Sequence, residues 1–94
     1  MSQRITIEQL IQILGGDREL VITLIERGVI DENPEAGYSP EQVERALVSY
    51  TLVHELDVNF EGVEVILHMR ERMLATQRQF CDVLDELRRR RDRG

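Results

Sequence analysis

The side chains best suited to catalysis or metal binding in this 94-residue chain are two histidines and one cysteine. His54 and His68 lie on different predicted helices, and no HExxH motif, Cys-His cluster or nucleophile elbow surrounds them. Cys81 is the single cysteine, so it can form neither an intramolecular disulfide nor a zinc site by itself. We therefore interpret all three as structural or surface residues.

Phosphate and carbonyl chemistry also lacks its usual residues. The chain contains no lysine, and all 12 basic residues are arginine. This excludes a phosphate-loop lysine and a Schiff-base lysine, and no Gly-rich phosphate motif is present. The many carboxylates are spread along predicted helix faces, as solvated charges usually are. We expect a protein that is not an enzyme and uses no cofactor or metal.

Charge is divided unevenly along the chain. Residues 1–65 carry four arginines and 13 acidic residues, a net charge of −9, whereas residues 66–94 carry eight arginines and five acidic residues, a net charge of +3. The acidic part would repel a duplex phosphate backbone, which argues against DNA as a partner. The terminal RRRRDR is either a solvated helix end that offsets the helix dipole or a tail for nucleic acid or an acidic protein.

Composition fits a small globular protein, since 41% of the residues are hydrophobic and 32% are charged. The longest apolar runs are too short for a membrane span, so we expect no membrane association of that kind. The first ten residues lack the apolar stretch of a secretory signal, and we expect a cytoplasmic protein.

Capping and turn residues divide the chain into four predicted helices. Thr6 and Asp17 are placed to cap the first two, Gly15-Gly16 separates them, and Gly28 ends the second. Two short helices joined in this way are typical of a helix-turn-helix unit. Residues 29–38 then fit a small hairpin, or wing, although an irregular loop fits the same length.

The third predicted helix has the clearest start. Ser39 caps it, Pro40 takes its first position and Gln42 completes a capping box; the helix runs to about Leu56. Asn59 caps a fourth helix that continues to about Arg91. The sequence thus predicts a mainly all-α fold with a helix-turn-helix domain over residues 1–57 and a long C-terminal helix with a basic tail over residues 58–94.

Apolar residues on the fourth helix recur every seven positions, with Arg70, Gln77 and Leu84 as the intervening partner positions. The front domain is too small to cover a helix of this length. A second copy is the simplest partner, which predicts a homodimeric coiled coil, although packing within the monomer remains the alternative. The predicted dimerisation residues are Ile66, Met73, Phe80, Leu84 and Leu87.

The third helix carries a second apolar patch on a helical wheel. The expected core face contains Val43, Ala46, Leu47, Tyr50 and Val53. Val48 and Leu52 lie nearly opposite and adjoin each other. Apolar side chains surrounded by charge suit a basic partner protein, but contact with the fourth helix is equally compatible. The predicted partner-binding residues are Glu41, Glu44, Arg45, Val48, Leu52 and Glu55.

The order of these elements resembles the MerR-like winged-helix architecture. The segments ERGVI at 26–30, YSPEQVERA at 38–46 and, most specifically, HELDVNFEGVEVILHMRERM at 54–73 are similar to bacterial chaperone-modulator proteins of the CbpM type. The resemblance implies binding to the J-domain of a DnaJ- or CbpA-like co-chaperone, and so regulation of its cooperation with DnaK. J-domains carry a basic helix that engages Hsp70, for which an acidic modulator could compete.

The alternative is a MerR-like transcription regulator that uses Arg18, Arg27 and the C-terminal arginines on DNA. The resemblance implies an Arg-Tyr pair in the second helix of DNA-binding relatives, where this chain has Ile22 and Thr23. Ser39 also stands where arginine often follows the wing tyrosine. The wing carries the acidic residues Asp31, Glu32 and Glu35. Because base and phosphate contacts need donors, these departures favour the adaptor.

Overall fold

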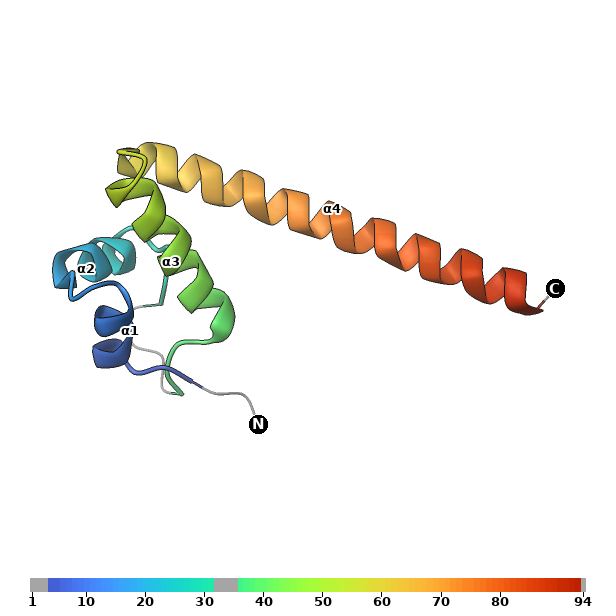
Figure 1. Ribbon diagram of the computed structural model, residues 1–94, viewed down its shortest axis with the longest axis horizontal. Coiled ribbons are helices and arrows are strands. Elements are labelled where there is room, and N and C mark those ends of the chain that lie inside the picture. The colour runs from blue at the N-terminus through green and yellow to red at the C-terminus, as the bar shows by residue number, and fades with distance from the viewer. Residues whose placement is uncertain (1–3, 32–35, 94) are drawn as a thin grey trace. The chain divides into compact units, whose positions relative to one another are not determined.

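The computed structural model describes residues 4–31 and 36–93, and this part of the chain contains four helices (Figure 1). They are α1 (Ile7–Ile13), α2 (Arg18–Glu26), α3 (Pro40–His54) and α4 (Phe60–Arg93). Within the described ranges the only β pairing is an isolated antiparallel bridge between Ile5 and Tyr38. The prediction of a mainly α-helical fold is confirmed. The chain forms two compact units, residues 1–64 and 65–94.

Side chains cap the helices where the sequence places them. The Thr6 hydroxyl accepts a hydrogen bond from the Gln9 backbone N–H at 3.1 Å, and the Gln9 side chain accepts one from the Thr6 N–H at 2.9 Å, which completes a capping box. The Asp17 carboxylate accepts from the Leu20 N–H at 3.1 Å. Asn59 accepts from the Gly62 N–H at 2.8 Å, so α4 begins one residue later.

Ser39 also caps α3, by accepting from the Gln42 N–H at 3.3 Å, and Pro40 begins the helix. The predicted capping box at this end is wrong in its second half. The Gln42 side chain does not return to Ser39. Its Oε1 accepts from the Asp31 N–H at 2.8 Å, so Gln42 ties the start of the preceding loop to α3.

Unit 1, residues 1–64, has its own apolar core. Ser49 is the one polar residue that joins this core among the described residues, and its hydroxyl donates to the Arg45 carbonyl at 2.8 Å. This bond to the carbonyl four residues earlier removes the main cost of burying a hydroxyl group. The buried apolar side chains of the unit are Leu10, Ile11, Leu14, Leu20, Val21, Leu24, Val29, Ile30, Tyr38, Ala46, Leu52 and Val63.

The predicted faces of α3 need correction because of Ser49. The buried face is centred on Ala46, Ser49 and Leu52, and the Leu52 side chain is only 8% exposed. Leu47, expected in the core, is 40% exposed. A wheel that counts only apolar residues leaves out a buried serine and therefore rotates the core face toward Leu47. Leu52 belongs to the core and is not a surface contact.

Tyr38 anchors the segment predicted as a wing, although its backbone pairs elsewhere than expected. Its N–H donates to the Ile5 carbonyl at 2.7 Å and its carbonyl accepts from the Ile5 N–H at 3.0 Å, so it pairs with the segment before α1. Its buried hydroxyl donates to the Asp31 carbonyl at 2.9 Å. Glu32 and Glu35, two of the acidic residues of the predicted wing, lie outside the described residues.

Candidate functional site

The outer face of α3 carries most of the predicted partner-binding residues. Glu41, Glu44 and Glu55 are exposed, Val48 is half-buried and Arg45 is half-buried beside the core. With Leu52 in the core, the exposed Leu47 takes its place next to Val48. The positions of Glu44, Leu47, Val48 and Glu55 put them on one side of the helix. We call the set Glu41, Glu44, Leu47, Val48 and Glu55 the acidic α3 face.

The exposed face of α2 has the same character. Glu19, Ile22 and Glu26 follow one another at spacings of three and four, so they share one side of the helix. All three are exposed, and the Ile22 side chain is 46% exposed. Thr23 beside them uses its hydroxyl to donate to the Glu19 carbonyl at 2.9 Å. This face therefore offers carboxylates and an apolar side chain.

Arg27, just after α2, makes its contacts within unit 1. Its guanidinium donates to the Glu64 carboxylate at 3.0 Å, lies 3.6 Å from the Glu61 carboxylate, and covers the Phe60 ring with 5.1 Å between the guanidinium carbon and the ring centroid. The hydrogen bond that Arg27 donates to Glu64 raises the pKa of Arg27, and the charges of both carboxylates add to this. The side chain fastens the end of α2 to the first turns of α4.

His54 joins the end of α3 to the start of α2. Its Nε2 lies 2.7 Å from an Asp17 oxygen, and its ring lies against the Tyr50 ring with 4.6 Å between centroids. The hydrogen bond from the Leu20 N–H, followed by the contact with His54, holds the pKa of the Asp17 carboxyl below its usual value. Through these two contacts His54 links α3 to the capping residue of α2.

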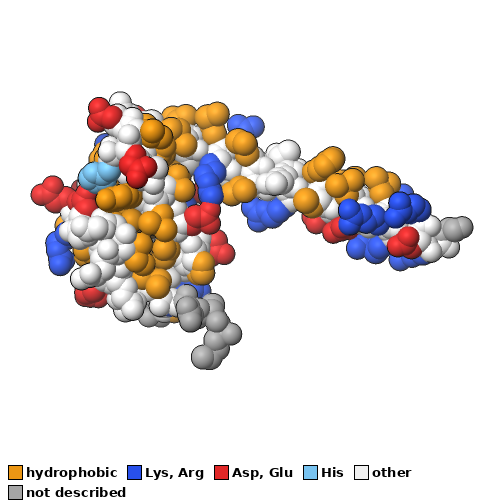
Figure 2. Space-filling view, viewed as in Figure 1, with side chains coloured by type: hydrophobic (Ala, Val, Ile, Leu, Met, Phe, Trp, Pro, Cys, Tyr) orange, Lys and Arg blue, Asp and Glu red, His pale blue; other side chains and the backbone are white. Residues whose placement is uncertain are grey.

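Unit 2, residues 65–94, consists of α4 beyond its first turns and exposes apolar side chains in two groups along the helix, with a polar stretch between them (Figure 2). The predicted dimerisation residues Met73, Phe80, Leu84 and Leu87 are all exposed, with Phe80 at 62%, and Ile66 is half-buried. These are accessible positions for a partner helix.

The sequence prediction placed Arg70, Gln77 and Leu84 between the heptad residues and missed a second set of intervening positions, which contains two exposed apolar residues. Met69 and Val83, which are 57% and 56% exposed, lie three residues after Ile66 and Phe80, and Thr76 lies three after Met73. The signal was available, because spacings of four and three are those of a coiled-coil heptad. We call the alternating line Met69, Met73, Thr76, Phe80, Val83 and Leu87 the seam.

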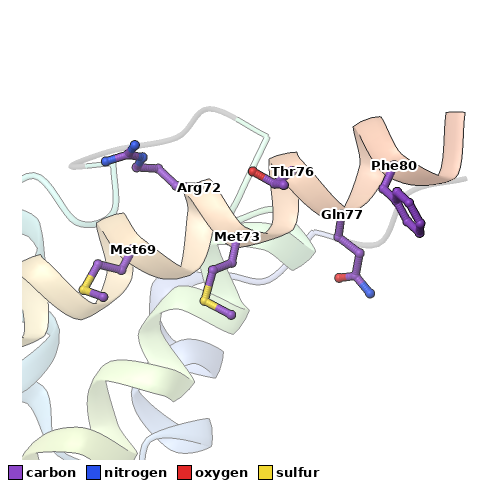
Figure 3. A pocket seen from close by; sticks show the side chains of 6 residues that line it. All are labelled: Met69, Arg72, Met73, Thr76, Gln77 and Phe80. Atoms are coloured by element: carbon purple, nitrogen blue, oxygen red, sulfur yellow. The ribbon is translucent and has the colours of Figure 1, made fainter. Parts of the chain in front are cut away.

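The first half of the seam borders an open groove of about 660 Å³ along α4 (Figure 3). Met69, Met73 and Phe80 project from one side of the helix into it, and Arg72, Thr76 and Gln77 complete the lining. An open, largely apolar surface with few polar groups suits another apolar helix better than a charged ligand.

The remaining candidate chemistry is dispersed. Cys81 is an exposed free thiol and His68 is exposed. In the ranges that the structure describes, no three histidine, cysteine or acidic side chains are grouped so that they could bind a metal ion. None of the helices traced there combines the length and apolar character needed to span a membrane.

Comparison with known proteins gives no relative. No protein-family model, curated protein or solved structure matches the chain.

Proposed function

We propose that this chain is a chaperone-modulating adaptor that binds the J-domain of a DnaJ- or CbpA-like co-chaperone and regulates its activity with DnaK. The observation that carries the proposal is the acidic α3 face, on which the exposed Leu47 and the half-buried Val48 lie between the carboxylates of Glu44 and Glu55. An apolar centre with charged surroundings is the usual composition of a protein-binding patch. The resemblance of residues 54–73 to chaperone modulators supplies the partner.

Charge supports a basic partner. Residues 1–65 carry a net charge of −9, and the exposed side of α2 adds Glu19 and Glu26 to the carboxylates of α3. A basic helix, such as the one that J-domains use to engage Hsp70, would be attracted from a distance and oriented by this surface. Competition for that helix would inhibit the co-chaperone.

The alternative, a MerR-like DNA-binding regulator, has less support from the same elements. Arg27, one of the arginines it would use, is hydrogen-bonded to Glu64 and lies over Phe60. Ile22 and Thr23 occupy α2 where the DNA-binding relatives are expected to have donors. A phosphate backbone needs donors at these positions, and the exposed side of α2 presents mainly acceptors.

The adaptor is tested by titrating a purified J-domain into the protein in a calorimeter. The double variant Leu47→Asp/Val48→Asp should weaken binding by about tenfold or more, because the apolar centre of an interface carries most of its energy. Ile13→Asp, at an exposed apolar position on α1, is the matched control and should bind normally. Circular dichroism should give the same helix content for all three proteins.

Two outcomes would contradict the proposal. Undiminished binding by the double variant would remove the acidic α3 face as the contact surface. Specific, salt-sensitive retardation of an operator duplex, without J-domain binding, would favour the DNA-binding alternative.

We also propose that two copies of the chain associate through α4. The exposed seam supports this, since six positions with one polar exception lie on one side of a helix whose distal part has no packed core of its own among the described residues. Apolar side chains at heptad spacing lose their contact with water when a second such helix packs against them.

A further inference from the structure

We infer that the cleft where α2 meets the end of α3 receives one lysine or arginine side chain from the basic helix of the partner protein. This inference rests on the proposed function, because it names a contact that the J-domain would make in addition to the acidic α3 face. The cleft has a volume of about 180 Å³, and the residues that line it all belong to unit 1. It is too small for a helix, which is about 10–12 Å across, so it fits a single side chain.

Apolar side chains from three helices form the walls of this cleft. Leu20 comes from α2, Val53 from α3 and Phe60 from the start of α4. Leu20 is buried, whereas Val53 and Phe60 are half-buried, so part of the apolar wall stays in contact with water. The methylene groups of a lysine or arginine side chain would cover it, since these side chains bury their apolar stems and keep their charged ends at the surface.

The polar side chains of the cleft mainly accept hydrogen bonds. The Asp17 carboxylate accepts from the Leu20 N–H at 3.1 Å and contacts His54 Nε2 at 2.7 Å, and an ionised carboxylate has about four acceptor positions, so others remain. Thr23 donates its hydroxyl hydrogen to the Glu19 carbonyl at 2.9 Å, so its oxygen can only accept from a ligand. The exposed Glu19 carboxylate adds further acceptor positions. A ligand that satisfies these groups must bring hydrogen-bond donors.

Charge selects a cation as the occupant of the cleft. The hydrogen bond from the Leu20 N–H, followed by the contact with His54, lowers the pKa of Asp17, so this carboxylate is negatively charged at neutral pH. Residues 1–65 carry a net charge of −9, which attracts a basic side chain toward unit 1. Lysine and arginine combine a positive charge, several donors, no acceptor and an apolar stem, and they therefore match both the walls and the polar groups of the cleft.

Arg27 shows how this part of unit 1 binds a guanidinium group. Its guanidinium carbon lies 5.1 Å from the centroid of the Phe60 ring, and its nitrogens contact the carboxylates of Glu61 and Glu64. Phe60 also lines the cleft, where the two carboxylates of α2 stand near it in the same way. Because Glu61 and Glu64 offset the charge of Arg27, this arginine opposes the entry of a second cation only weakly.

Two matched variants of α2 test the cleft by titration with a purified J-domain in a calorimeter. Glu19→Gln removes a carboxylate that lines the cleft, and Glu26→Gln removes one on the same exposed side of α2, about 10 Å farther along the helix. Both variants lose the same charge, so long-range attraction changes equally. The dissociation constant should rise roughly fivefold for Glu19→Gln and by less than about twofold for Glu26→Gln. Equal losses would show that both carboxylates act only from a distance, and would overturn the inference.

Filling the cleft is a second test that removes no charge. Thr23→Phe places a large side chain in the cleft and should weaken J-domain binding by about fivefold or more, because the space for the basic side chain is lost. Ile13→Phe, at an exposed position on α1 outside the cleft, is the control and should bind normally. Circular dichroism should give the native helix content for both variants. Undiminished binding by a folded Thr23→Phe protein would refute the assignment of the cleft.

A double-mutant cycle identifies the side chain that enters the cleft. Each lysine and arginine of the J-domain's basic helix is replaced in turn by methionine, which keeps an apolar stem without the charge, and is titrated with the native chain and with Glu19→Gln. One replacement should reduce the effect of Glu19→Gln to less than about twofold, because the cation that Glu19 contacts is then absent. A fivefold effect that persists with every replacement would overturn the inference while leaving the adaptor intact. A native chain that binds no J-domain would contradict the proposed function itself, and this inference with it.

Discussion

Asp17 offers the sharpest test of how unit 1 is held together, because its two carboxylate oxygens have different tasks. One accepts the hydrogen bond from the Leu20 N–H and caps α2, and the other contacts His54 at 2.7 Å. Asp17→Ala removes both interactions. Asp17→Asn keeps a capping oxygen but removes the charge that faces His54, so the two variants separate the two contributions.

The expected magnitudes follow from these contacts. Loss of a capping side chain costs about 1 kcal/mol. The contact with His54 is partly exposed, with 29% of the Asp17 side chain and 44% of the His54 side chain accessible, so it contributes about 0.5 kcal/mol. We expect Asp17→Ala to lower the free energy of unfolding by about 1.5 kcal/mol and the Tm by about 6–12 °C. Asp17→Asn should lose only about a third of this.

Thermal and urea unfolding followed by circular dichroism at one fixed protein concentration would measure these differences, with Glu26→Ala as a control for loss of an exposed carboxylate. The pKa of Asp17 is lower in the folded state than its ordinary value of 3.8. Its charged form therefore stabilises the fold above about pH 4, and this stability is lost as the pH falls through the lowered pKa. Equal losses in the Ala and Asn variants would refute the reasoning. So would a difference in stability between the native chain and Asp17→Asn that survives below the lowered pKa of Asp17.

Three further substitutions test the packing of unit 1. Leu24→Ala, in a fully buried position, should cost about 2–5 kcal/mol in urea unfolding, and a loss below 1 kcal/mol would contradict its place in the core. Tyr38→Phe removes the hydroxyl that donates to the Asp31 carbonyl and should cost about 1 kcal/mol; an unchanged Tm would show that this bond contributes nothing. Gly62→Ala would bring a methyl group to 2.7 Å from Cγ1 of Val58, so we expect a loss of about 1–3 kcal/mol by calorimetry, and a more stable variant would contradict the close approach.

Local signals in the sequence predict the helices of this chain well. Thr6, Asp17 and Ser39 each cap the helix that they were expected to begin, and Asn59 does so for α4. Capping depends on a side chain and a backbone N–H two or three residues away, so the sequence contains all the information that is needed.

Two interactions between segments that are separated in sequence were not predicted, and neither was the burial of a polar residue. Ile5 pairs with Tyr38 across an interval that no local pattern encodes. The Gln42 side chain accepts a hydrogen bond from the Asp31 N–H instead of completing a capping box with Ser39. The burial of Ser49 depends on a hydrogen bond that an apolar count omits, which is why Leu47 and Leu52 were assigned to the wrong faces of α3.

The two candidate surfaces could likewise be predicted only in part from the sequence. The acidic character of the α3 face follows from composition, but its apolar centre could be assigned only after the burial of Leu52 was known. The exposed line on α4 was recognisable from its heptad spacing, yet Met69 and Val83 were passed over in favour of Arg70 and Leu84. Counting spacings of three and four from each heptad position would have found them.

The division of charge connects the two proposals. The acidic residues of unit 1 suit a basic partner, and the arginines of unit 2 would compete for the same carboxylates if they were free in solution. The proposed pairing through the seam would leave the acidic α3 face available for a basic helix, because the seam residues belong to unit 2 and this face belongs to unit 1.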